Sequence, residues 1–118
     1  MIYKKNIRLA PTQFMMDVLV CPFQDLFSLL QEKYPGVRFE VDEGLMDLGS
    51  VWTVSTKKGT KILVYIHELD DVVTVAHEAL HVTYLLDSWC GFNYSKDNEE
   101  SHAYMHSYIM ELILNLKK

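Results

Sequence analysis

The sequence predicts a single α+β domain with the order helix, three strands and two helices. Three observations lead to this prediction. Strand-like segments occupy the middle of the chain, apolar residues recur at helical spacing on both sides of them, and Pro and Gly residues separate the segments. A chain of 118 residues fits one domain, 1–118, and 49% hydrophobic residues are enough for a core of its own.

The N-terminal part of the chain predicts one helix. Residues 7–10 can form a short strand, and residues 12–20 fit either a helix or a strand. Pro22 suits the first position of a helix, and apolar residues then recur at helical spacing until Pro35. We therefore expect a helix over about 22–33.

The middle of the chain predicts a small sheet. Residues 37–41 alternate strictly between apolar and polar, as a half-buried strand does. Residues 51–56 and 62–66 are rich in strand-forming side chains, and the polar break between them contains a glycine, as a hairpin turn does. We expect a three-stranded, mostly antiparallel sheet arranged as a meander.

Two helices are expected after the sheet. The first begins after Asp70-Asp71, either of which can cap it, and runs to about Asp87. Apolar residues cover nearly every side of this helix, which is typical of a buried one. Asp97 with Glu100 three residues later resembles a capping box, and the last helix is expected over about 98–116.

Charge and cysteine content exclude several classes of protein. Eleven basic and 16 acidic residues give a net charge of −5, which does not fit a general nucleic-acid binder or a protein docked on an anionic membrane. The chain shows no apolar run long enough for a membrane span and no signal peptide. Cys21 and Cys90 stand apart and are interpreted as free thiols, with one disulfide as the alternative. We expect a cytoplasmic protein that binds neither nucleic acid nor a membrane; the sequence does not indicate its oligomeric state.

The helix expected to begin after Asp70-Asp71 contains an H-E-x-x-H motif, His77-Glu78-Ala79-Leu80-His81. Residues four apart point the same way from a helix, so the two imidazoles can hold one zinc ion. Glu78 projects to the side of them, where it can take a proton from a metal-bound water. The plainer alternative is a pair of core histidines beside a surface glutamate.

A catalytic zinc site needs a third protein ligand. Asp87 stands at the last ligand position of the pattern H-E-x-x-H-x-x-G-x-x-H. Tyr84 replaces its glycine, however, and on an unbroken helix Asp87 lies off the metal face. Glu99 and Glu100 are the other candidates, and either can instead simply favour the helix dipole. Periodicity does not choose between them.

The last helix also carries His102 and His106, again four residues apart. Such a pair can bind a second metal ion, but half-buried helix histidines are the commoner case. We expect the commoner case here.

The two motifs together resemble those of the short zinc metallopeptidases carried by bacteriophages and prophages. Their pattern is H-E-x-x-H, a further turn and a half of helix, a loop, and E-x-x-A-Y at the start of the last helix. Here the second motif is Glu100-Ser101-His102-Ala103-Tyr104. The resemblance covers about residues 49–112, and the layout is more loosely similar to minimal zincins of the ImmA/IrrE type. The family pattern has mainly apolar or small residues where His102 and His106 stand.

The resemblance implies a minimal zincin-like fold with one Zn²⁺. It implies Glu100 as the third ligand beside His77 and His81, with Glu99 as the alternative. The activity implied is zinc-dependent hydrolysis of a peptide or protein in the cytoplasm, which is the host's if the gene is phage-borne. The alternative is a catalytically weak or inactive, zinc-stabilised protein that binds a host or partner protein.

In that mechanism Glu78 is the general base, and Tyr104 is the first candidate for a donor to the oxyanion. Residues 62–66, if they form an edge strand, can pair with an extended substrate. His67, at the end of that strand, is interpreted as a loop residue.

Overall fold

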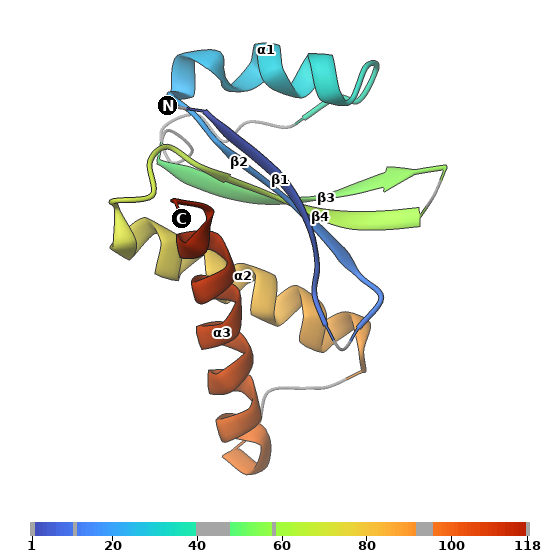
Figure 1. Cartoon of the computed structure of the whole chain (residues 1–118). Helices are drawn as coiled ribbons and strands as arrows, with labels where there is room; N and C mark the ends of the chain where they lie inside the picture. Colours follow the sequence, from blue (N-terminus) through green and yellow to red (C-terminus); the bar gives the residue numbers. More distant parts are fainter. Residues whose placement is uncertain (1, 11, 40–47, 58, 92–95, 118) are drawn as a thin grey trace.

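The computed structural model describes residues 2–10, 12–39, 48–57, 59–91 and 96–117. One sheet lies between two helical layers, with α1 on one face and α2 and α3 on the other (Figure 1). The strands are β1 (Tyr3–Arg8), β2 (Met15–Val20), β3 (Gly49–Thr56) and β4 (Gly59–Ile66). The helices are α1 (Phe23–Lys33), α2 (Val72–Trp89) and α3 (Glu99–Leu114), and short 3₁₀ turns at Lys96–Asn98 and Asn115–Lys117 flank α3.

The four strands form a mixed sheet in the order β1-β2-β4-β3. β1 and β2 are antiparallel, β2 and β4 are parallel, and β3 and β4 form the expected antiparallel hairpin, with Thr56 opposite Gly59. The parallel pair arises because β4, the second strand of the hairpin, lies beside β2, while β3, which is antiparallel to both, lies outside it. The architecture is therefore α+β, as the sequence predicts, but with a different sheet.

The prediction of a three-stranded meander is wrong in two respects. Residues 37–39, the described part of the segment 37–41, are not a strand; residues 40 and 41 lie outside the described residues. Phe39 instead packs its ring against Trp52, 5.5 Å away between centroids. The sheet gains two N-terminal strands, since the ambiguous segment 12–20 contains β2 and the short strand expected at 7–10 is β1, which starts earlier.

The ambiguity of residues 12–20 has a physical cause. β2 is an inner strand that is buried along five of its six residues, so its apolar residues do not alternate with polar ones. A continuous apolar run of this length fits a buried strand and a buried helix equally well. Only the pairing with β1 and β4 selects the strand.

The helices follow the sequence closely. The helix expected at 22–33 is α1, and the two C-terminal helices are α2 and α3, each within about two residues of the expected ends. The capping box expected from Asp97 and Glu100 is not formed. Asn98, and not Asp97, is the residue that precedes α3, and its side chain does not cap the helix; Lys96–Asn98 forms a 3₁₀ turn.

Two cores lie on the two faces of the sheet. On the α1 face, strand side chains such as Leu63 pack with Leu26 and Leu30 of the helix. On the other face, side chains of β2 and β4 pack with α2 and with Ile109 and Ile113 of α3. Because α2 is enclosed between the sheet and α3, only one side of it remains exposed, and this is the side that carries the candidate site.

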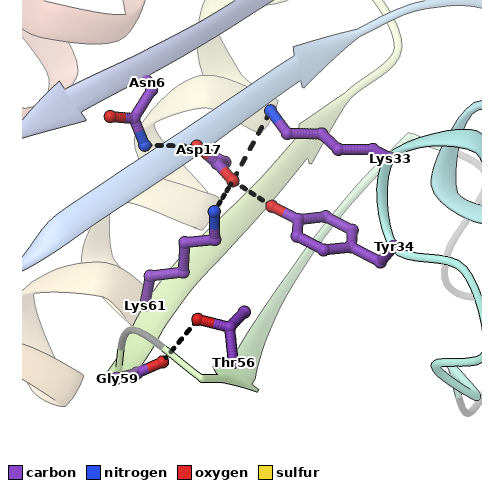
Figure 2. Close-up of polar contacts among 7 residues, drawn as sticks. All are labelled: Asn6, Asp17, Lys33, Tyr34, Thr56, Gly59 and Lys61. Carbon is purple, nitrogen blue, oxygen red and sulfur yellow. Dashed lines mark hydrogen bonds and ion pairs between the residues drawn. The ribbon is translucent and has the colours of Figure 1, made fainter.

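A buried carboxylate on β2 joins the sheet to the end of α1 (Figure 2). Asp17 is 1% exposed and accepts from Lys61 at 2.8 Å, from Asn6 at 2.5 Å and from the hydroxyl of Tyr34, with Lys33 at 3.5 Å. Burial alone would raise the pKa of Asp17, but these hydrogen bonds and the Lys33 charge together hold it below its ordinary value. The carboxylate is therefore fully partnered and ionised.

Two further features of the chain are plain in the structure. Cys21 and Cys90 are both free, the first buried and the second exposed, so the disulfide alternative does not apply. None of the described helices combines the length and the apolar character that a membrane span requires.

Candidate metal centre

The start of α2 is fixed by a side-chain cap. Asp71 accepts the backbone N–H of Thr74 at 3.1 Å and its hydroxyl at 2.6 Å, and Nε2 of His67 lies 2.9 Å from the same carboxylate. These hydrogen bonds, that of the Thr74 hydroxyl above all, lower the pKa of Asp71 to about 2. The cap satisfies a backbone N–H of the first turn of α2, which has no partner within the helix. His67 is thus a loop residue that supports the cap.

His77 and His81 are brought together on the exposed side of α2. Their Nε2 atoms lie 3.2 Å apart and their ring centroids 4.9 Å apart. This is hydrogen-bond distance, and the tautomers decide which ring donates. Two ligands of a tetrahedral zinc ion, each 2.0–2.1 Å from the metal, are separated by about 3.3 Å. The two nitrogens therefore already have the spacing that one zinc ion needs.

Glu78 points to the other side, toward the first residue of β3. Its side chain is 6% exposed. Gly49 packs so closely here that a Cβ would lie 2.9 Å from Cγ of Glu78 and 2.8 Å from Cγ2 of Thr74. Burial raises the pKa of Glu78, and the charge of His77 opposes only part of that rise. A carboxyl with a raised pKa is suited to take up and return a proton near neutral pH.

The first turn of α3 does not complete the ligand set. Among the residues that the structure describes, no three His, Cys, Asp or Glu side chains are grouped so that they could hold a metal ion. Glu99 and Glu100 are both exposed and do not join the histidine pair of His77 and His81.

The two glutamates differ in the direction in which they leave the helix. His106 marks the side of α3 that faces α2, since its Nε2 donates to the carbonyl of Ala76 at 2.9 Å. At about 100° per residue, Glu99 lies within roughly 20° of His106 around the helix axis, whereas Glu100 lies about 120° away. The side that faces α2 is therefore the side of Glu99.

Tyr104 is not placed near the histidine pair. Its side chain is 73% exposed, and it lies about 160° around α3 from His106. A different tyrosine shares the face of the pair: Tyr84 follows His77 by seven residues, which is about 20° around α2. In the sequence Tyr84 stands at the glycine position of the extended zinc-binding pattern, and its spacing of seven residues from His77 is the signal for this shared face.

Asp87 and His102 form a contact between α2 and α3. Nδ1 of His102 lies 2.5 Å from Oδ2 of Asp87, and the His102 ring packs against Tyr84 at 4.9 Å. Asp87 is thus engaged with α3 rather than with the histidine pair, in agreement with its expected place off the metal face. Both residues stand out in the sequence, but their pairing does not, because it joins two helices across 15 positions.

The surface around the histidine pair is apolar. Val73 is 81% exposed, Leu80 38% and Tyr84 47%, and all three lie on the same side of α2 as His77 and His81. A cavity of about 290 Å³ lies elsewhere, between β1 and the end of α3, and none of the predicted site residues lines it.

No protein-family model matches the sequence, and no curated protein or solved structure shows a significant match to it.

Proposed function

We propose that this chain is a zinc-dependent metallopeptidase with a minimal zincin-like fold. The observation that carries the proposal is the spacing of 3.2 Å between Nε2 of His77 and Nε2 of His81. Buried Glu78, with its raised pKa, is the residue next to the first of them. Two imidazoles at ligand spacing with an adjacent carboxylate are the donor set that hydrolytic zinc sites use.

The third ligand in this proposal is a glutamate of the first turn of α3. Glu100 matches the downstream motif of the phage-type peptidases that the sequence resembles. Glu99 lies on the side of α3 that faces α2. Both are close enough to the helix N-terminus that a modest shift of the first turn changes their reach, so metal titration of the single variants decides between them.

Zinc bound to this set would lower the pKa of its water and polarise a peptide carbonyl. Glu78 would take the proton of the attacking water and return it to the leaving amine. Its burial against Gly49 keeps the carboxylate on one side of the histidine pair and away from bulk water. Tyr84, on the face of the pair, is a candidate donor to the developing oxyanion, alongside the Tyr104 that the motif suggests.

The strand that could accept an extended substrate is β3 and not β4. Residues 62–66 do not meet the condition of an edge strand, because β4 lies between β2 and β3. β3 is the outer strand on that side, and its first residue packs against Glu78. A peptide paired along β3 would pass Glu78 and the exposed apolar side of α2, which favours substrates with apolar side chains.

The test begins with metal content. The chain, purified without a histidine tag and supplied with zinc, is expected to contain about one zinc per chain by elemental mass spectrometry. His81→Ala should lose the metal, and either Glu99→Gln or Glu100→Gln should weaken its binding. A wild-type chain without zinc would overturn the proposal.

Hydrolysis is then measured with casein and with a peptide library. Glu78→Gln should keep the zinc and lose turnover, because only the proton acceptor is removed. Turnover that survives this substitution would contradict the mechanism. Zinc without any hydrolysis would favour the alternative, a zinc-stabilised protein that binds a partner.

A further inference from the structure

The outer strand β1, dark blue in Figure 1, concentrates positive charge at one edge of the sheet. Among the described strands it pairs only with β2, so the backbone groups along its other side can pair with a further strand. Its six residues include three cations, Lys4, Lys5 and Arg8, and no acidic residue. The chain as a whole has a net charge of −5. β1 is therefore a basic edge on an acidic protein.

The described part of the chain does not neutralise these three cations. Their side chains are exposed, and within the described residues none of them forms an ion pair. The lysines that do form ion pairs, Lys33, Lys61 and Lys117, lie on other elements. The charge of β1 is thus available to a partner.

A hollow lies beside this basic edge. A cavity of about 290 Å³ is bounded by β1 and the C-terminal end of α3, and its lining includes Tyr3, Lys4, Lys5, Ile7, Leu112 and Leu116. Tyr3 and Ile7 belong to the core on the α2 and α3 side of the sheet. A strand added beside β1 would direct every second side chain to this side. The apolar part of the lining suits an apolar side chain, and the two lysines suit a carboxylate.

A second copy of this chain is a poor partner for β1. Pairing of two β1 strands would bring the cations of one copy against the same cations of the other, and like charges opposite each other in a strand pair are destabilising. Lysines on edge strands hinder such pairing between copies. For an acidic strand the sign is reversed, because opposite charges across a strand pair attract. Charge thus disfavours self-association and favours an acidic segment.

We propose that β1 is a docking site for an extended acidic segment of another protein, which joins the described sheet as an additional strand. Backbone hydrogen bonds along β1 orient the segment, its carboxylates meet Lys4, Lys5 and Arg8, and an apolar side chain enters the cavity. In this mode of recognition, edge pairing gives affinity and alternate side chains give specificity. The site lies at the opposite edge of the sheet from β3 and does not involve the zinc ion of the proposed function.

The test uses the full chain with EDTA present, so that zinc-dependent hydrolysis does not interfere. The probes are fluorescein-labelled seven-residue peptides with glutamate at alternate positions and leucine, valine or phenylalanine between them. Fluorescence anisotropy measures the dissociation constant, and amide chemical shifts locate the bound peptide. Binding is expected in the micromolar range, with the shifts concentrated on residues 3–8.

Charge reversal on β1 is the main variant. Lys5→Glu combined with Arg8→Glu should weaken binding roughly 10-fold or more, because two attractive cross-strand pairs become repulsive. Lys5→Gln combined with Arg8→Gln should weaken it less, and this neutral variant decides if the charge-reversed chain does not fold. Lys57→Glu is the matched control, because it reverses an exposed lysine between β3 and β4 and should leave the affinity near that of wild type.

Two altered peptides separate strand pairing from charge attraction. A peptide with the same side chains but with methylated internal backbone nitrogens cannot pair as a strand and should bind poorly. A peptide with lysine in place of glutamate should not bind. Leu116→Ser, which removes part of the apolar lining, should reduce the affinity for the phenylalanine peptide.

The inference would be overturned if none of the acidic peptides bound, or if the charge-reversed and neutral variants bound them as tightly as wild type. Equal affinity for the methylated peptide, or shifts concentrated on β3 instead of β1, would also overturn it. None of these results bears on the zinc site, and a chain that binds no zinc would leave the docking of the peptide unaffected.

Discussion

Replacement of the buried carboxylate by Asp17→Asn should destabilise the fold without touching the candidate site. Asp17 is 1% exposed, and the change leaves the ammonium groups of Lys61 and Lys33 without their counter-ion. Breaking a buried ion pair costs about 3–5 kcal/mol. The two lysine side chains remain 24% and 33% exposed, so water solvates them in part and we expect about 2–3 kcal/mol.

The assay is urea and thermal unfolding followed by tryptophan fluorescence and circular dichroism. The loss corresponds to a melting temperature about 8–12 °C lower for a domain of this size. Lys61→Met is combined with Asp17→Asn in a double-mutant cycle. The double variant should lose less unfolding free energy than the two single variants lose together. Glu32→Gln, an exposed carboxylate on α1, is the control and should stay within about 0.5 kcal/mol of wild type. An Asp17→Asn variant as stable as this control would refute the reasoning.

The same carboxylate predicts a pH dependence. The pKa of Asp17 is lower in the folded chain than the ordinary 3.8, so the folded chain binds this proton less readily than the unfolded chain. Its contribution to stability is complete well above pH 3.8 and is lost as the pH falls through that value toward the folded pKa. The difference between wild type and Asp17→Asn should therefore be constant between pH 7 and 5 and shrink below pH 4. Unfolding free energies that stay equally far apart at low pH would contradict this.

Three further substitutions test other parts of the structure. Burial raises the pKa of Glu78 above its ordinary 4.5, so the contribution of this group to stability is present below about pH 4.5 and is lost as the pH rises. Glu78→Gln should therefore raise the melting temperature at pH 7 but not at pH 4. A variant that melts at the same temperature as wild type at both pH values would contradict this. Gly49→Ala should cost about 1–3 kcal/mol in urea unfolding, since its Cβ would lie 2.8–2.9 Å from two side chains of α2, whereas Ser50→Ala next to it should be nearly neutral. Ile109→Ala should cost about 2–5 kcal/mol, because this fully buried side chain packs α3 into the core; a loss below 1 kcal/mol would mean that α3 is not packed as described.

The helices and the hairpin were predictable because their signals are local. Helix α1 lies between Pro22 and Pro35 and shows a repeat of apolar residues at helical spacing. Asp71 caps α2 at the expected place. The sheet was less predictable. Strand pairing depends on partners far apart in the sequence, and the alternation in residues 37–39 serves ring packing beside α1 instead of a strand. β2, apolar on both faces, carries no periodic signal that distinguishes it from a helix.

The candidate site was predictable where it depends on one helix. The i, i+4 spacing places His77 and His81 next to each other on one face of the helix. The third ligand depends on how α3 lies against α2, and the sequence offered two adjacent glutamates without a means of choosing. Tyr104 fits the motif but leaves α3 on the side away from α2.

The sequence by itself determined the helical segments, the β3–β4 hairpin, the histidine pair and the glutamate beside it, because each is signalled within one continuous stretch of the chain. Only the tertiary structure decided the order of the strands and the partners of Asp17. It also decided that Gly49 allows β3 to close over Glu78, and that His102 and His106 donate to α2. These features join segments between ten and about 45 residues apart. Such contacts form only when burial of the two cores brings the segments together, and no local pattern encodes which donor will meet which acceptor.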